Sequence, residues 1–400
     1  MIARALRTRW FPWAAALIAA AGASLASTEL PASPASPPAP APNPALFETL
    51  APLLALATDE ARWSDPAQSG RIEAGLSSLA EAAPQLNRHA ATRDFAFREV
   101  GRALARDAAR TRDLHALEAF EEARASVVEI TATCAACHAR LPAPPHAPGP
   151  TLPPDALAKL SLHAQAQVWL ALRHFDRALA VWEAAFADEM QSPGHLDMEG
   201  YLLDYMTIGL RVAQDPARVR RHFARFARRP DMPVYLAGHL AGWDLALAAV
   251  EADLAHPAPL ERSRDLVAGE GVPRPALLGR EQTVYDLAAS SLLLQFIEGN
   301  SQEPEALAEA YFLLGVVEAR SVDSYWLPQA EAHLEAAVRT APASGSAASA
   351  YALLEEYMVV GFGGAGEEAL TSEAWEKLRD LNLRMQEARA PAEKPAAPPP

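Results

Sequence analysis

The stretch Cys134-Ala135-Ala136-Cys137-His138 organises the whole sequence, because it contains the only two cysteines among 400 residues. Thiols three positions apart lie about one helical turn apart, so each can form a thioether with a vinyl group of the same haem. The histidine that follows is then held against the iron as its proximal ligand. The spacing therefore predicts one covalently attached haem c, with His138 bound to the iron.

Two other uses of a Cys-x-x-Cys pair do not fit the surrounding sequence. A thiol–disulfide redox motif follows a strand and opens a helix in a β-α-β unit, and no such pattern flanks Cys134. A structural zinc site needs about four ligands, and the sequence has no second cysteine or histidine pair at metal spacing. Haem attachment is the interpretation that uses all three residues.

The N-terminus has the pattern of a secretory signal peptide. Its parts are a basic start, an apolar run and a small-residue cleavage site: Arg4, Arg7 and Arg9, then residues 10–25, then Ser24-Leu25-Ala26. We expect residues 1–26 to be cleaved on export to the periplasm, where haem can be attached. The alternative is an uncleaved membrane anchor, but the apolar run contains Pro12 and is shorter than the roughly 20 residues of a membrane span. We therefore expect no stable span after cleavage.

The composition is acidic and half hydrophobic, with a formal net charge of -15 and a pI near 5.2. A nucleic-acid-binding protein would carry a basic footprint, so this class is not expected. The simplest explanation of the net negative charge is that it keeps an exported protein dispersed, because like-charged molecules repel each other.

Proline- and alanine-rich stretches divide the chain. Residues 27–45 and 142–154 have this composition and are expected to be linkers. They bound a block at 46–141 that contains the cysteine motif and a helical region at 155–386. Residues 387–400 are expected to be a disordered tail.

Helical periodicity predicts an all-α fold, with four amphipathic helices in the first block. Pro84 is expected to end the second helix, and the fourth is expected to start near Asp113 and run to the cysteine motif. The four apolar faces are Leu46, Leu50, Leu53, Leu54 and Ala57; Ile72, Leu76, Leu79 and Ala83; Phe95, Phe97, Val100, Leu104 and Ala108; and Leu114, Leu117, Phe120, Ala123, Val127, Val128 and Ile130.

A Cys-x-x-Cys-His motif at the end of a fourth helix resembles the class II c-type cytochromes, the cytochrome c′ and c-556 group. The resemblance covers about residues 45 to 141 and rests on Cys134, Cys137, His138 and the order of the helices. It implies a four-helix haem-binding bundle. The chain departs from the group after the motif, where Ala139-Arg140-Leu141-Pro142 stops the helix and members often have an aromatic or basic pair.

The resemblance also bears on the second axial ligand of the iron. Cytochromes of the c-556 type take a methionine from the first helix, but this sequence has no methionine between Met1 and Met190. The corresponding first-helix candidates, which cannot ligate, are Leu50, Leu53 and Leu54. The class II geometry thus implies a five-coordinate iron. Weaker histidine candidates are His89 and His115 in the block, and His146 and His163 beyond it.

The helical region at 155–386 contains two segments with tetratricopeptide-repeat (TPR) spacing. The first is Trp169, Leu172, His174 to Leu179, Trp182 and Ala185. The second is Tyr311-x2-Leu314-Gly315 with Ala330-x3-Leu334, Ala337 and Pro342. In such a helical hairpin Gly315 and Ala330 allow close approach, while Tyr311 and Leu334 fill the space between repeats. A TPR-like domain is expected, with an irregular helical domain as the alternative.

One arginine cluster stands out in this acidic chain: Arg218, Arg220, Arg221, Arg225, Arg228 and Arg229. Most such runs are solvated helix faces, and a docking site for an acidic partner is the alternative. The run Gly361-Phe362-Gly363-Gly364-Ala365-Gly366 lacks the lysine and hydroxyl residue of a phosphate-binding loop, so we expect a turn there.

These features predict an exported monohaem cytochrome that passes electrons to or from a redox partner docked on the TPR-like domain. Two alternatives remain. The protein could bind or sense a small gas at a five-coordinate iron, or it could be a scaffold that assembles a complex around a structural haem. An enzyme is not expected, because no triad, metal cluster or paired carboxylates stand out.

Overall fold

The computed structural model describes residues 44–90, 95–139, 152, 157–158, 160–269, 280–299, 303–320, 329–362 and 372–390. All of them belong to one compact unit, Ala41–Pro400. The expected signal peptide and most of both linkers lie outside these residues. The helices are α2 (Pro44–Ala57), α3 (Glu60–Trp63), α4 (Ser69–Ala90), α5 (Phe95–Ala116), α6 (Phe120–His138), α7 (Leu162–Ala171), α8 (Phe175–Ala187), α9 (Pro193–Met198), α10 (Tyr201–Arg211), α11 (Pro216–Phe226), α12 (Val234–Val250), α13 (Pro259–Ala268), α14 (Glu281–Gly299), α15 (Pro304–Arg320), α16 (Ala330–Thr340), α17 (Gly345–Phe362) and α18 (Ser372–Arg389), with short 3-10 turns at Pro66–Gln68 and Asp253–Ala255.

The all-α prediction is confirmed, since no strand occurs in the part of the chain that the structure describes. Polar caps begin several helices. The Asp59 carboxylate accepts the Ala61 N–H at the start of α3, and Asp215 accepts the Arg218 N–H at the start of α11. Asp65 caps the 3-10 turn before α4, and Pro66 follows it as the first residue of the turn. These side chains satisfy N–H groups that have no partner within the helix.

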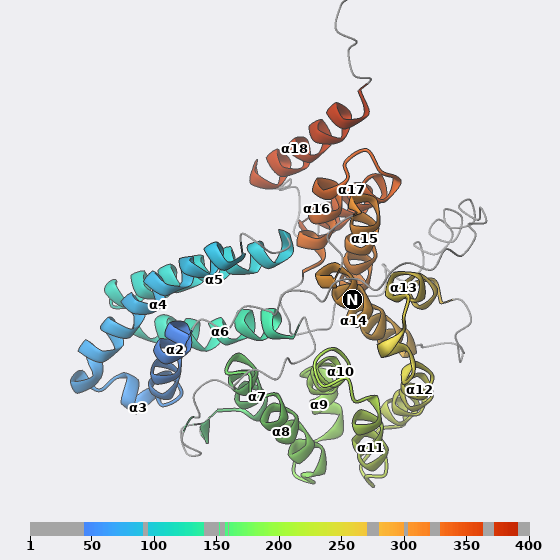
Figure 1. Cartoon of the computed structure of the whole chain (residues 1–400). Helices are drawn as coiled ribbons and strands as arrows, with labels where there is room; N and C mark the ends of the chain where they lie inside the picture. Colours follow the sequence, from blue (N-terminus) through green and yellow to red (C-terminus); the bar gives the residue numbers. More distant parts are fainter. Residues whose placement is uncertain are drawn as a thin grey trace, which may run out of the picture. The chain divides into compact units, whose positions relative to one another are not determined.

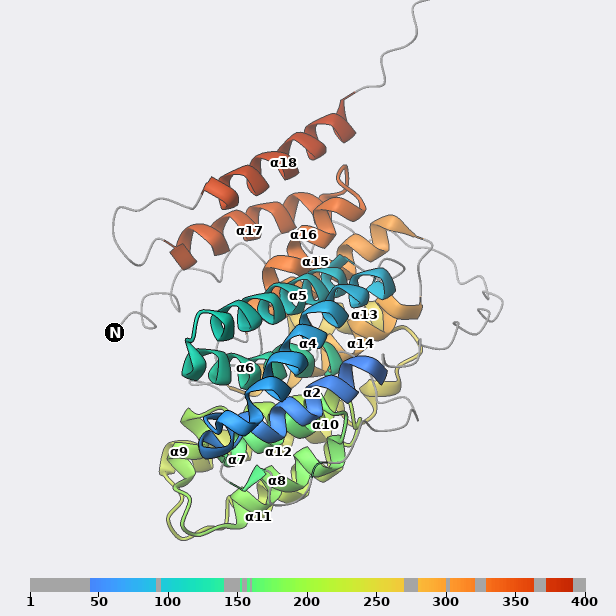
Figure 2. The same cartoon turned by 90° about the vertical axis from the view of Figure 1, so that its left-hand side faces the viewer.

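The first helices form a helical bundle (Figures 1 and 2). Helix α2 contacts α4, α4 contacts α5, α5 contacts α6, and α6 contacts α2. The predicted apolar faces of the first two helices point inward, with Leu50, Leu54 and Leu79 at most 1 % exposed. Gly75 of α4 lies against Leu53 of α2, so the absence of a side chain at Gly75 sets how closely these helices approach.

Two predicted helix ends in this block are wrong. Helix α4 continues through Pro84 to Ala90, because Pro84 lies on an exposed side of a helix whose opposite face packs against α5. The expected fourth helix is also misplaced, since residues 113–116 belong to α5 and α6 starts at Phe120. Leu117 is therefore 78 % exposed in the turn rather than part of an apolar face.

From α7 onward, helices contact mainly their neighbours in sequence. Helix α7 contacts α8, α11 contacts α12, and an unbroken series of neighbour contacts runs from α13 to α18. Contact between successive hairpins is typical of stacked helical repeats, in which each unit covers the apolar face of the next. One continuous cluster of buried side chains extends from Leu46 to Met385, so the two expected domains share a core.

The α15–α16 hairpin shows why small residues occupy its crossing. A Cβ at Gly315 would lie 2.6 Å from Leu334 Cδ2, and Leu334 is fully buried. Tyr311 is buried on the same helix and stacks on His333, with 6.4 Å between ring centroids. Gly315 thus allows the close approach of α15 and α16 that the sequence spacing predicted.

We expect Gly315→Ala to lower the free energy of unfolding by about 1–2 kcal/mol. Overpacking a filled core costs about 1–3 kcal/mol, and the better helix propensity of alanine offsets up to about 1 kcal/mol of it. Urea denaturation measures the change. Gly238→Ala in α12 is the matched control, because nothing lies within 4 Å of its Cβ position and this variant should be slightly stabilised. Equal effects at both positions would contradict the close packing.

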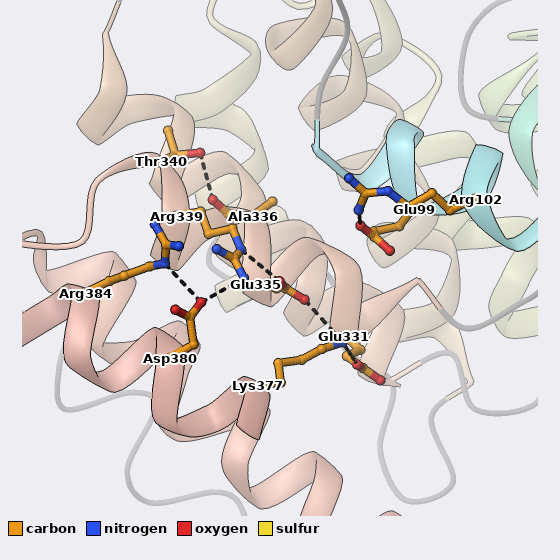
Figure 3. A network of polar contacts seen from close by, with 10 residues as sticks. All are labelled: Glu99, Arg102, Glu331, Glu335, Ala336, Arg339, Thr340, Lys377, Asp380 and Arg384. Carbon is orange, nitrogen blue, oxygen red and sulfur yellow. Dashed lines mark hydrogen bonds and ion pairs between the residues drawn. The ribbon is translucent and has the colours of Figure 1, made fainter. Parts of the chain in front are cut away.

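Ion pairs hold the last helix to α16 (Figure 3). Arg339 of α16 donates to Glu335 at 2.8 Å and to Asp380 of α18 at 3.2 Å. Lys377 of α18 donates to Glu331 of α16 at 2.6 Å. Helix α18 ends at Arg389, just beyond the boundary expected at 386.

Helix α5 also contacts α16, so the bundle meets the later helices at more than one place. In Figure 3 the Glu99–Arg102 ion pair of α5 lies beside α16. No helix among the described residues is long and apolar enough to cross a membrane.

Candidate haem attachment site

Helix α6 carries the whole cysteine motif in its last turns. Cys134 is 6 % exposed and belongs to the hydrophobic core, whereas Cys137 is partly exposed. No disulfide joins them. Burial raises the pKa of Cys134 to about 12, and the neighbouring Cys137 acts in the same direction. Three positions apart, the two cysteines are neighbours on the surface of α6, and the inner one, Cys134, is a neutral thiol at neutral pH.

His138 is the last residue of α6 and is fixed by a hydrogen bond to a later helix. Its Nδ1 lies 3.1 Å from the carbonyl oxygen of Leu170 in α7. Because a carbonyl oxygen only accepts, this bond places the ring proton on Nδ1 and leaves a lone pair on Nε2. A metal-bound histidine usually makes such a bond with its other nitrogen.

The electrostatic surroundings keep His138 neutral. Burial and the nearby Arg173 cation lower the pKa of His138 to about 4, while the hydrogen bond to Leu170 acts in the opposite direction. At neutral pH the imidazole is therefore uncharged, which is the form that binds a metal. Two thiols and one oriented, neutral imidazole are the groups that attachment of a covalent haem would use.

The Leu170 carbonyl can accept a hydrogen bond from His138 because it lies in the last turn of α7. The Arg173 N–H donates to it at 2.9 Å, and the His174 N–H donates to the carbonyl of Trp169 at 2.8 Å. Arg173 has φ +61°, in the left-handed region. This pattern closes a helix with a residue in left-handed conformation. Sequence reasoning missed Leu170 and Arg173, because only the fold brings the end of α7 to the end of α6.

Helix α2 packs against α6 in the opposite direction. Near the start of α6, Arg124 Nη1 donates to the carbonyl of Ala57, the last residue of α2, at 3.3 Å. The first turns of α2 are therefore nearest to the cysteine motif. The first-helix candidates Leu50, Leu53 and Leu54 are all buried, and a leucine side chain has no donor atom for an iron.

His115 does not fit the role of second axial ligand. It lies at the end of α5, where its ring packs on Phe120 at 5.1 Å between centroids. Helix α6 begins at Phe120, and at 1.5 Å per residue His138 is roughly 27 Å farther along it. His115 and His138 thus occupy opposite ends of the bundle.

The other histidine candidates differ in position. His163 is buried in α7, where its Nε2 lies 3.0 Å from Gln167 and 3.4 Å from Asp204. Helices α4, α5 and α6 alternate in direction, so the last turn of α4, with His89, lies at the same end as His138. The His89 side chain and all of His146 are outside what the structure describes.

The arginine cluster on α11 divides into two groups. Arg218, Arg220 and Arg229 form internal ion pairs, for example Arg218 with Glu183 at 2.7 Å. The other three side chains are exposed and form no ion pair with the described residues; positions 221 and 225 share one face of α11, and position 228 lies in the turn after its end. Only this second group is open to a partner.

Within the described ranges no three histidine, cysteine, aspartate or glutamate side chains converge as a metal site. A haem would need only one protein ligand besides its thioethers, so the lack of such a group among the described residues does not bear on the cysteine motif. Comparison of the chain with protein-family models, curated proteins and solved structures gave no match.

Proposed function

We propose that this chain is an exported c-type cytochrome with one haem, attached through Cys134 and Cys137 and ligated by His138. The observation that carries the proposal is the hydrogen bond from His138 Nδ1 to the Leu170 carbonyl. It presents the lone pair of Nε2 one residue after the second thiol. A surface histidine next to a chance cysteine pair would have no need of such a fixed orientation.

The arrangement of α2, α4, α5 and α6 supports the resemblance to class II cytochromes. Each helix contacts the next and α6 returns to α2, while the motif occupies the last turns of α6. That is the helix order and haem position of the group. The haem would supply a one-electron iron centre, and the protein residues would hold and shield it.

We infer that the haem passes electrons to or from a partner docked on the helices that follow it. The contacts of α7 with α8, of α11 with α12 and along α13 to α18 support a TPR-like array, a fold that would provide extended binding surfaces. His138 is bonded directly to the first of these helices. A partner bound there would be close to the haem.

Binding of a small gas is the second candidate function. The sequence from residue 2 to 189 contains no methionine, and the described part of α2 presents buried leucines to the core. An iron with His138 as its only protein ligand would have an open coordination position.

Absorption spectra of the reduced, full-length protein with and without carbon monoxide test these two functions. Electron transfer alone needs no open coordination position, so a spectrum that the gas leaves unchanged would favour it. A shift of the main haem band by the gas would favour the second candidate. Absence of any haem spectrum from protein exported by cells that assemble cytochromes c would contradict both.

A further inference from the structure

Helix α12 is apolar on all of its sides, including the side that is exposed. Asp244 is the only carboxylate among its 17 residues, and the helix has no lysine or arginine. A surface helix of a globular protein carries polar residues on its exposed side, and a helix that is apolar all round is normally covered. The composition of α12 therefore indicates that its exposed side is an interface.

The exposed side of α12 consists of apolar residues at helical spacing. Val234 is 90 % exposed and Leu245 is 61 % exposed. Ala241 and Ala248 are exposed too, and they lie four positions before and three positions after Leu245, on the same side of the helix. These four residues form the α12 face. At 1.5 Å per residue it is about 21 Å long, which is the length of a helix of about four turns.

The neighbouring helix α11 supplies positive charge beside the α12 face. Arg220 of α11 lies 3.2 Å from Asp244 and 3.9 Å from Glu251, so the carboxylates next to the α12 face are already paired. Arg221 and Arg225 are exposed, one turn apart, and form no ion pair with the described residues. In a chain with a net charge of -15 they make this surface locally basic.

We propose that the α12 face and the exposed arginines of α11 form a docking surface for an acidic amphipathic helix of a partner protein. The apolar side of that helix packs on Val234 and Leu245, as in other complexes that bind a helix through its apolar side. Carboxylates one turn apart beside its apolar side pair with Arg221 and Arg225, and this charge complementarity fixes the register. The inference goes beyond the proposed function, because the surface needs no haem.

Two other occupants fit the charges of this surface less well. Anionic lipid attracts clusters of roughly four to eight basic side chains, whereas the exposed arginines here are Arg221, Arg225 and Arg228 in an acidic chain. A second copy of this chain carries the same net charge of -15, and like charge opposes association. An acidic partner helix uses both the apolar face and the arginines.

Fluorescence anisotropy with the full-length protein at low salt tests the surface. The probe is a synthetic helical peptide of about four turns, with leucines on one side and glutamates beside them. We expect it to bind. Arg221→Gln with Arg225→Gln should weaken binding about tenfold, because two ion pairs are lost. Leu245→Gln should also weaken it about tenfold, because an apolar contact is lost while a side chain of similar length remains.

Arg106→Gln with Arg110→Gln on α5 is the matched control, because these arginines are also exposed and one turn apart. It should leave the affinity unchanged. A second peptide, with lysines in place of the glutamates, should bind at least about tenfold more weakly.

The proposal is overturned if the acidic peptide does not bind, if both peptides bind equally, or if the α11 and α5 variants lose equal affinity. Tighter binding to phosphatidylglycerol vesicles through the same arginines would identify a lipid surface as the occupant instead. A dimer in light scattering that Leu245→Gln converts to a monomer would identify a second copy. Protein without covalent haem should bind the peptide equally well, so this proposal and the proposed function can fail separately.

Discussion

Replacing both Cys134 and Cys137 by serine is expected to yield a protein without covalently bound haem. Serine has no thiol to form a thioether, and His138 alone would leave haem held only by coordination and packing. The mass of the denatured chain and a haem stain after denaturing electrophoresis measure the result. The wild type should keep its haem through both procedures, and each single variant should keep one thioether. Covalent haem in the double variant would refute the site.

Cys134 needs a second variant because its side chain lies in the core. A serine hydroxyl buried in the hydrophobic core costs about 1–3 kcal/mol without a hydrogen bond, so Cys134→Ser could lose haem through misfolding. Cys134→Ala with Cys137→Ala avoids that polar group. Circular dichroism of these variants should keep the helical signal, and haem loss in a folded chain then reports on attachment.

The cysteine motif could be predicted from the sequence because its chemistry is local. A thiol spacing of three and an adjacent histidine specify two thioethers and one ligand without reference to any other segment. The Leu170 carbonyl could not be predicted in this way, since any residue can supply a carbonyl oxygen. Its proximity to His138 depends on the packing of α7 against α6.

The helix boundaries show a second limit of sequence reasoning. The turn between α5 and α6 contains neither glycine nor proline, and Glu118 takes the left-handed conformation with φ +62° instead. Periodicity alone therefore extended the fourth helix back to Asp113. At Pro84 the usual stop signal was present, yet packing of the other face of α4 against α5 kept the helix intact.

The role of small residues where two helices cross was easier to predict from the sequence, because it depends on side-chain volume. The Tyr311-x2-Leu314-Gly315 spacing indicated a close hairpin, and Gly315 indeed faces Leu334. The same device recurs where no repeat pattern was recognised. A Cβ at Gly209 of α10 would lie 2.3 Å from Val219 of α11. The sequence pattern therefore identified one such crossing, while the structure shows that close crossings are more general.

Ion pairs between helices far apart in the chain could not be predicted from the sequence. One of them is expected to contribute strongly to the free energy of unfolding. Arg211 of α10 donates to Ser290 of α14 at 2.6 Å and to Glu318 of α15 at 2.7 Å. Both charged side chains are only about one-tenth exposed, at 11 % and 12 %. The cluster thus joins three helices through a nearly buried cation.

We expect Glu318→Gln to lower the free energy of unfolding by about 3 kcal/mol, because it leaves the Arg211 cation buried without a counter-charge. Glu309→Gln is the matched control, since the Arg264–Glu309 pair also involves α15 but is 44 % and 28 % exposed. An exposed pair contributes at most about 1 kcal/mol. Urea denaturation of both variants gives the comparison. A double variant, Arg211→Met with Glu318→Leu, should recover most of the loss because it removes both charges together. If Glu318→Gln costs no more than Glu309→Gln, the buried cation does not hold α10, α14 and α15 together.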